Sequence, residues 1–245
     1  MNNSESFQIH LSSTDADMIN GNKSDCVFNL PVIEIDSQQQ IYISVQSAVI
    51  PYTFYNINDS NNVLNYTLNG TFFNMTITNG NYNVNTLKTW LNANLFYNFT
   101  VSYNLNQNTF TFTNSQYDFT FLSSSTCLGL LGFSSTTSSH FQTLTSTQSI
   151  NLFPIQCVCV STNIKTNNIN KHSINNNSVL CSMPVDVNPY GVLVYKNMNG
   201  FRVNTFTNVI SSLNIRIVDH LNNIINLNGH DWSITIQIDI IDYVN

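Results

Sequence analysis

Hydrophobic and polar residues alternate along much of this chain, most clearly toward its C-terminal end. From Leu213 to Ile217 every second residue is apolar, and the residues between them are polar. After a polar turn that contains Asn228-Gly229, the segment from Trp232 to Ile240 repeats the alternation with an apolar residue at every even position. Period-two alternation over this length predicts half-buried antiparallel strands rather than helices.

Further short alternating or apolar runs, separated by polar turns, continue through most of the sequence. The expected strands are 7–11, 26–30, 41–50, 63–68, 72–77, 99–103, 109–113, 119–122, 155–164, 179–185, 191–195, 209–218 and 232–240. Val, Ile, Thr, Phe and Tyr fill these runs, as half-buried strands prefer. So many runs at a spacing of roughly 8–12 residues predict a mainly β protein, built as a sandwich or barrel.

One segment has a different period. Between Asn83 and Leu95 apolar residues recur at helical spacing, and Asn83 or Asn85 is a suitable N-cap. A second short helical turn is expected at 126–133. These two segments, with the strands between them, predict an α+β block over residues 53–143 that carries one clear helix.

All-β portions, residues 1–52 and 144–245, flank this block, and the Ser/Thr-rich stretch 134–139 is its expected exit linker. If strand 41–50 pairs with strands after Ile150, the α+β block is an insertion into a single sandwich. Tandem domains with a boundary near residue 143 are the alternative. The sequence pattern does not separate the two arrangements.

The composition is unusual for a folded protein. Charged residues make up 8% of the chain, against roughly a quarter in ordinary soluble proteins. Asparagine replaces them, at about one residue in six, but the apolar fraction of 42% is high enough for a folded core. An AT-rich genome explains part of the asparagine. A surface of amides and hydroxyls also repels its neighbours weakly, which favours close packing against other subunits.

Charge and apolar content exclude several partners. The net charge is −6 and the basic residues are scattered, so we expect no direct nucleic-acid binding and no attraction to anionic membranes. These residues are Lys23, Lys88, Lys165, Lys171, Lys196, Arg202 and Arg216. No apolar run approaches the roughly 18 residues of a membrane span, and the N-terminus does not have the pattern of a signal peptide. We therefore expect a reducing compartment and no membrane span.

The candidates for metal or catalytic chemistry are weak. His10, His140, His172, His220 and His230 include two that stand next to acids, in Asp219-His220 and His230-Asp231. A two-His, two-Asp metal cluster there lacks fixed ligand spacing, so polar turns are the favoured explanation. Asp15 and Asp17 do not belong to an EF-type calcium loop.

The cysteines and serines give no stronger signal. Cys157 and Cys159 share one face of a strand without a second metal-ligand pair, and Cys127 has apolar neighbours, so core thiols are expected. Cys26 and Cys181 complete an odd set of five. No nucleophile elbow and no glycine-rich phosphate loop occurs. We expect no enzyme activity, no catalytic or metal site and no cofactor. The aromatic group Tyr52, Phe54 and Tyr55 suggests core or interface packing more than carbohydrate stacking.

Four segments in this order carry a resemblance to a known family. They are 47–58 (SAVIPYTFYNIN), 80–87 (GNYNVNTL), 130–133 (LLGF) and 225–234 (INLNGHDWSI). Together, over about residues 40–240, they resemble minor capsid (penton) proteins of virophages, Polinton-like viruses and related large double-stranded DNA viruses. The resemblance implies an antiparallel jelly-roll sandwich, five copies of which close the icosahedral vertices beside the major capsid proteins.

The expected function is therefore that of a structural virion protein. The resemblance implies a homopentamer that contacts major and other capsid proteins, is located in the virion and is assembled in the host cytoplasm. The resemblance supplies no catalytic residues. Two alternatives remain: a cement-type minor capsid protein elsewhere in the lattice, and a glycan-binding β module of a viral fibre or spike. Exposed aromatic residues clustered on the inserted block would favour the glycan-binding alternative.

Overall fold

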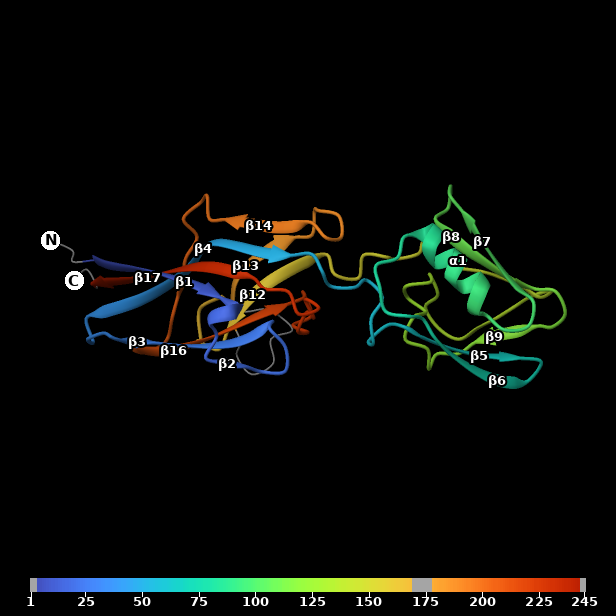
Figure 1. Ribbon diagram of the computed structural model, residues 1–245, viewed down its shortest axis with the longest axis horizontal. Coiled ribbons are helices and arrows are strands. Elements are labelled where there is room, and N and C mark those ends of the chain that lie inside the picture. The colour runs from blue at the N-terminus through green and yellow to red at the C-terminus, as the bar shows by residue number, and fades with distance from the viewer. Residues whose placement is uncertain (1–3, 169–177, 243–245) are drawn as a thin grey trace. The chain divides into compact units, whose positions relative to one another are not determined.

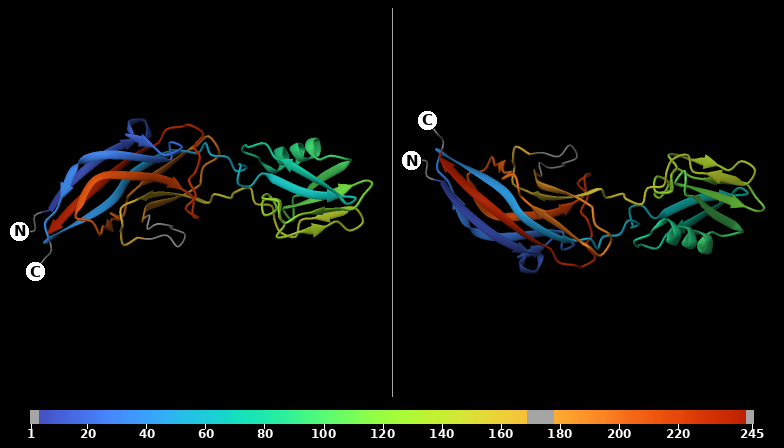
Figure 2. Two further views of the ribbon diagram at one scale, coloured as in Figure 1. Left: turned by 90° about the horizontal axis from the view of Figure 1, so that it is seen from below. Right: turned by 90° about the horizontal axis from the view of Figure 1, so that it is seen from above.

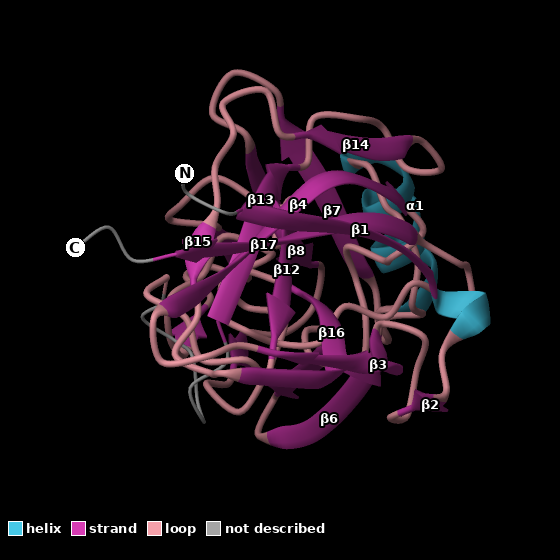
Figure 3. Cartoon of the chain, turned by 90° about the vertical axis from the view of Figure 1, so that its left-hand side faces the viewer, coloured by secondary structure: helices cyan, strands magenta, loops and turns pink. Residues whose placement is uncertain are grey.

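The computed structural model describes residues 4–168 and 178–242, which are mainly β-strand (Figures 1 and 3). The chain forms two compact units. Unit 1 comprises Met1–Phe54 and Ile155–Asn245, and unit 2 comprises Tyr55–Pro154. Residues 144–154 thus belong to unit 2 and not, as predicted, to the flanking β portion, because Leu144, Ile150 and Leu152 are buried in the core of unit 2. Lys171 and His172 lie outside the described residues.

Unit 1 contains two antiparallel sheets (Figure 1). The first sheet has the order β1 (Ser4–Ser12), β17 (Ser233–Asp242), β4 (Gln39–Pro51) and β14 (Val192–Lys196), and β15 (Val203–Asn204) also pairs with β4. The second sheet has the order β13 (Ser178–Pro184), β12 (Cys157–Thr162), β16 (Val209–Val218), β3 (Asp25–Glu34) and β2 (Met18–Ile19). A 3-10 turn, η1 (Ser13–Asp15), follows β1.

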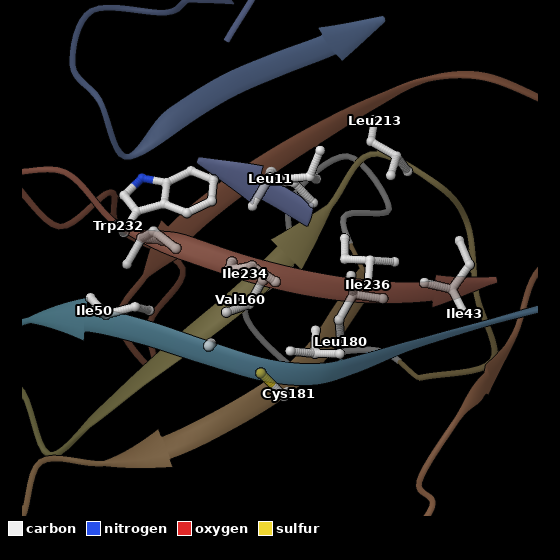
Figure 4. Packing of buried hydrophobic residues seen from close by; sticks show 14 of the residues in the cluster. Leu11, Ile43, Ile50, Val160, Leu180, Cys181, Leu213, Trp232, Ile234 and Ile236 are labelled. Carbon is white, nitrogen blue, oxygen red and sulfur yellow. The ribbon is translucent and has the colours of Figure 1, made fainter. Parts of the chain in front are cut away.

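The core of unit 1 consists of the inward residues of both sheets (Figure 4). On β17 the even positions from Trp232 to Ile240 are buried, as the alternation predicts, and on β16 Leu213, Ile215 and Ile217 are fully buried. Complete burial of a side chain of this size contributes about 1.5–3 kcal/mol. Isoleucine on the central strands therefore provides much of the stabilisation of this unit.

Unit 2 has its own sheets and its own core. One sheet has the order β10 (Thr137–Ser138), β9 (Phe119–Phe121), β5 (Val63–Leu68) and β6 (Thr71–Thr76), and the other has the order β11 (Thr143–Thr145), β8 (Thr109–Asn114) and β7 (Phe99–Asn104). Its core is rich in aromatic rings in edge-to-face contact. The ring centroids of Phe112 and Phe121, for example, are 5.0 Å apart. The two hydrophobic cores share no residue.

Helix α1 (Val84–Asn94) lies along one side of the unit 2 strands and contacts β7 (Figure 2). Asn83 caps it, because its side chain accepts hydrogen bonds from the backbone N–H groups of Asn85 and Thr86. Leu87 and Leu91, on the inner face of the helix, are buried. The prediction of one helix at this position is confirmed, as is the mainly β, antiparallel fold class.

The second short helical turn expected at 126–133 is present as a single turn and does not extend into a regular helix. In this turn Leu131 N–H donates to Cys127 C=O and Phe133 N–H donates to Leu128 C=O. Gly132 interrupts the segment with a φ of +84°, outside the helical region. The buried leucines that suggested a helix instead pack into the core of unit 2.

Candidate interaction surfaces

The aspartates that stand next to His220 and His230 in the sequence stabilise turns and loop contacts. Asp219 Oδ1 accepts hydrogen bonds from the backbone N–H groups of Leu221 and Asn223. Asp231 Oδ1 accepts from Lys23 Nζ at 2.7 Å and from Ser13 Oγ at 2.7 Å. These two contacts lower the pKa of Asp231.

Within residues 4–168 and 178–242, no three His, Cys, Asp or Glu side chains come close enough together to hold a metal ion. Asp17 is also engaged locally, since its Oδ2 accepts from the backbone N–H of Asn29 at 2.7 Å. In the same part of the chain, no helix is long and apolar enough to cross a membrane.

All five cysteines are free thiols, and four of them are buried. Burial raises the pKa of Cys127 and Cys181 to about 12 and that of Cys26 to about 11, and it raises the pKa of Cys159 as well. Cys157, on the same face of β12 as Cys159, is half-buried. The four buried cysteines match the prediction of core thiols, whereas Cys157 is only partly covered.

We expect a thiol reagent to distinguish Cys157 from the other four cysteines. At pH 8 the buried thiols are almost wholly protonated and inaccessible, so the native protein should release about one equivalent of thionitrobenzoate, and the unfolded protein all five. The native equivalent should disappear in Cys157→Ser. Rapid release of two or more equivalents from the folded protein would contradict this expectation.

The aromatic group at the end of β4 is core packing. Tyr52 and Phe54 are buried and stack with ring centroids 4.3 Å apart, whereas Tyr55 is half-buried. Thr53, between the two buried rings, donates a hydrogen bond from Oγ1 to the backbone C=O of Leu227. These rings are therefore not offered to a ligand.

The outer face of the first sheet of unit 1 is a ladder of polar side chains, in which the charged Asp239 is paired with Arg202 at 3.7 Å. Across β1 and β17, His10 Nδ1 lies 3.0 Å from Thr235 Oγ1 and Gln8 Nε2 donates to Gln237 Oε1 at 3.4 Å. Ser6 Oγ donates to Asp239 at 2.5 Å. Because these groups satisfy one another, this face offers few free charges to a partner.

A small apolar strip lies at one edge of the same sheet. Val192 and Val194 on β14 are 47% and 59% exposed, and Val194 pairs in register with Val49 on β4, which is 42% exposed. In the described residues β14 pairs with β4 alone, so its outer edge has no strand partner. Strand β1 is the opposite edge of this sheet. Unpaired edges are sites at which another chain can add a strand.

Four exposed aromatic residues lie in the loops at one end of unit 2. We call this group, Phe96, Tyr97, Tyr117 and Phe141, the aromatic end of unit 2. Their exposed fractions are 57%, 60%, 41% and 83%. Strand β8 begins just after Asn108, whose C=O accepts from the N–H of Ile150 in the segment by which the chain leaves the unit, and ends at Asn114 at the aromatic end. The rings thus lie at the opposite end of these strands from that segment.

A buried asparagine holds the loops that carry three of these rings. Asn114 is fully buried; its Nδ2 donates to Tyr97 C=O, and its Oδ1 accepts from the backbone N–H of Tyr117 at 2.9 Å. Its own backbone N–H donates to Gln142 C=O, next to Phe141. Asp118 adds a second connection, since its Oδ1 accepts from the N–H of Gln142 at 2.8 Å.

The backbone of two of these loops lies in the left-handed region. Tyr97 and Asn98 have φ values of +61° and +60°, and Phe141 and Gln142 have values of +48° and +60°. Bulky residues adopt this conformation rarely, at a cost on the order of 1–3 kcal/mol each, and they keep it only where the surroundings enforce it. The hydrogen bonds of Asn114 to both loops provide that enforcement.

No protein-family model matches this chain, and no curated protein matches it. Among solved structures, the chain is similar to the crystal structure of the penton protein of mavirus, with 11% sequence identity and a TM-score of 0.46. The match covers 96% of this chain and 99% of that one. A similarity of this strength does not identify the family of the chain.

Sequence reasoning did not find the aromatic end of unit 2. Tyr97, Tyr117 and Phe141 lie in loops that are far apart in the sequence, where an isolated aromatic residue carries no signal by itself. Their proximity depends on the pairing of β7, β8 and β11. The detectable signal was an aromatic residue in each of several turns rich in Asn, Gln and Ser.

Proposed function

We propose that unit 1 is a jelly roll with unit 2 inserted between its third and fourth strands. Apart from the two-residue strands, unit 1 has eight strands in chain order: β1, β3, β4, β12, β13, β14, β16 and β17. They pair in nested fashion, first with last (β1·β17), second with seventh (β3·β16), third with sixth (β4·β14) and fourth with fifth (β12·β13).

The nested pairs also alternate between the two sheets. The first and third pairs belong to one sheet and the second and fourth to the other. A ribbon of paired strands that is wound so that successive pairs fall in opposite sheets has the topology of an eight-stranded jelly roll. This order of pairs is the observation that supports the proposal.

We further propose that the chain is a penton-type minor capsid protein, a structural and non-enzymatic virion component. Five copies would close an icosahedral vertex and pack against major capsid proteins, after assembly in the host cytoplasm. Three features support this role: the strand order of unit 1, the four sequence segments that resemble the penton family, and a surface in which amides and hydroxyls replace charges. Weak repulsion between like subunits favours close packing.

A ring of five identical subunits needs two different complementary faces on each copy. We place one of them at the free edge of β14, where Val49, Val192 and Val194 form the exposed apolar strip. Burial of this strip in a neighbouring subunit would remove three valine side chains from water and cover an unpaired strand edge.

The test is the oligomeric state of the purified full chain, measured by native mass spectrometry with negative-stain images of the same sample. We expect a closed ring of five. The double variant Val192→Lys/Val194→Lys should be monomeric, because an unpaired charge is costly to bury. Leu221→Lys, which changes a residue of similar exposure outside this edge, should keep the ring.

A closed ring of any other number would contradict the penton proposal. A monomer that also fails to bind purified major capsid trimers would contradict any capsid role. A monomer that binds such trimers would favour the cement-type alternative over vertex closure.

A further inference from the structure

We propose that the aromatic end of unit 2 binds a neutral oligosaccharide. This inference does not depend on the oligomeric state of the chain or on the jelly-roll topology of unit 1. It rests on four observations: the exposed rings, the buried asparagine that positions them, the chemistry of the side chains between them, and the size of the patch.

The rings are positioned before any ligand arrives. Asn114 contacts three loops through both ends of its side chain and through its backbone N–H, and its complete burial keeps these hydrogen bonds away from water. The left-handed residues Tyr97 and Phe141 are held in place by this network. A site that is ordered beforehand loses less conformational entropy on binding, which matters most for weak ligands such as sugars.

The exposed rings contribute little to the packing of the hydrophobic core. Phe141 is 83% exposed, and the ring contact found for it is with His140, at 4.1 Å between centroids. Tyr97 packs edge-on against Phe73, which leaves most of its ring in solvent. Clustered apolar groups at a protein surface usually mark a place of contact with a ligand or partner.

The chemistry between the rings is that of amides and hydroxyls. Asn69, Asn98 and Gln116 are exposed in these loops. Among residues 69–72, 96–98, 114–118 and 139–142, Asp118 is the one Asp, Glu, Lys or Arg, and His140 is the one histidine. Asp118 is already bound by Ser139 Oγ and by the N–H of Gln142. A neutral sugar complements such a surface, since its C–H groups pack on rings and its hydroxyls pair with amides.

Charge argues against two other ligands. These four loops contain no Lys or Arg, and the whole of unit 2 has Lys88 as its one such residue, so an anionic lipid surface or an acidic glycan finds no counter-charge. Across unit 2 the other charged residues are Asp59 and Asp118. The neutrality of the unit therefore selects a neutral ligand.

Size argues against a stable protein partner. The exposed parts of the four aromatic residues amount to about two and a half whole rings, or roughly 500 Å² at about 200 Å² for each ring. A stable protein interface buries about 800 Å² on each partner. An oligosaccharide of a few residues fits the smaller area.

Saturation-transfer NMR on the full chain tests the proposal, because it detects the ligand and tolerates a large assembly. The probes are neutral hexasaccharides of glucose, mannose, galactose and N-acetylglucosamine, with 3′-sialyllactose as an anionic comparison and phosphatidylcholine vesicles as a lipid comparison. Irradiation of the protein's aromatic protons should transfer saturation to the sugar C–H protons of at least one neutral hexasaccharide.

Two single variants locate the site. Phe141→Ala and Tyr117→Ala should each weaken the binding about fivefold, the loss typical of one stacking contact. Leu105→Ala is the matched control, since Leu105 is 80% exposed in the β7–β8 turn at the opposite end of these strands, and it should bind as the wild type does. Circular dichroism and the oligomeric state should be the same for all four proteins.

Several outcomes would overturn the proposal. One is the absence of transfer to every neutral hexasaccharide at about 5 mM, a concentration that reveals millimolar affinity. Another is binding that survives Phe141→Ala and Tyr117→Ala together but is lost in Trp90→Ala; that result would move the sugar to the shallow groove between Tyr82 and Trp90 on α1. Binding to the vesicles in place of the sugars would assign the rings to lipid contact.

Discussion

Replacement of Trp232 by alanine should destabilise unit 1 by about 3–5 kcal/mol, the range for removal of a buried large aromatic side chain. Trp232 is 2% exposed, and its ring packs edge-on against Phe28 at 6.0 Å between centroids. Its Nε1–H donates to the backbone C=O of Lys23 at 2.6 Å. Its backbone C=O accepts from the N–H of Ser13, so this residue connects β17 to two N-terminal segments.

Urea unfolding followed by far-UV circular dichroism measures this effect. With a slope of about 2 kcal/mol per M, a loss of 4 kcal/mol lowers the midpoint for unit 1 by about 2 M. Trp90, the second of two tryptophans, lies in unit 2, so its fluorescence in Trp232→Ala reports on the other core. We expect the urea midpoint reported by Trp90 fluorescence to be unchanged. A midpoint for unit 1 that falls by less than about 0.5 M would contradict the prediction.

Trp232→Phe separates the hydrogen bond from the packing. Phenylalanine keeps most of the apolar ring but removes the stronger of two donors to the C=O of Lys23, which then keeps the weak Cys26 thiol at 3.2 Å. Loss of the stronger hydrogen bond costs about 1 kcal/mol. We expect an intermediate loss of stability. A loss as large as that of Trp232→Ala would show that the N–H, and not the ring volume, dominates at this position.

Gly132→Ala should destabilise unit 2 by about 3 kcal/mol or more. Gly132 has a φ of +84°, and a β-carbon there would lie 2.3 Å from the backbone oxygen of Gln148. The left-handed conformation costs alanine about 1–2 kcal/mol, and the overlap adds about 1–3 kcal/mol because a backbone atom has to move. The Gln148 N–H also donates to Gly132 C=O, so the two segments cannot separate freely.

Gly70→Ala is the matched control for Gly132→Ala. Gly70 has a similar φ of +79°, in the Asn-Gly turn between β5 and β6, but a β-carbon there meets no atom within 4 Å. It should therefore lose only the conformational term, about 1–2 kcal/mol. Unfolding of unit 2 can be followed by Trp90 fluorescence in a Trp232→Phe background. Equal losses in the two glycine variants would rule out the steric argument.

Much of the secondary structure followed from local pattern. Each of the thirteen expected strands overlaps a strand of the structure, and the helix expected between Asn83 and Leu95 is present as α1. The strands that the pattern missed, β2, β10, β11 and β15, have two or three residues each. Such a length is too short for an alternation to be recognised, and these strands exist because a longer neighbour offers them hydrogen bonds.

Two segments show where local pattern stops being informative. Residues 126–133 contain leucines at a spacing that suits a helix but form only a single turn, and residues 144–154 follow a Ser/Thr-rich stretch that suits a linker. In both cases long-range burial in the core of unit 2 decides the structure: Leu131 is fully buried in a turn, and Leu144 packs from a short strand beside β8. Local pattern measures period and composition, and neither specifies which distant residues will be covered.

For the functional surfaces, the difference between what the sequence predicts and what the tertiary structure decides is larger. The sequence alone determined the fold class, the helix, the inward faces of the long strands and the near absence of charge, because each depends on residue type and short-range period. Only the tertiary structure decided the nested order of strand pairs and the meeting of Tyr97, Tyr117 and Phe141 around Asn114. Both arise from contacts between segments far apart in the chain, and one amino-acid sequence does not encode such contacts in any local period.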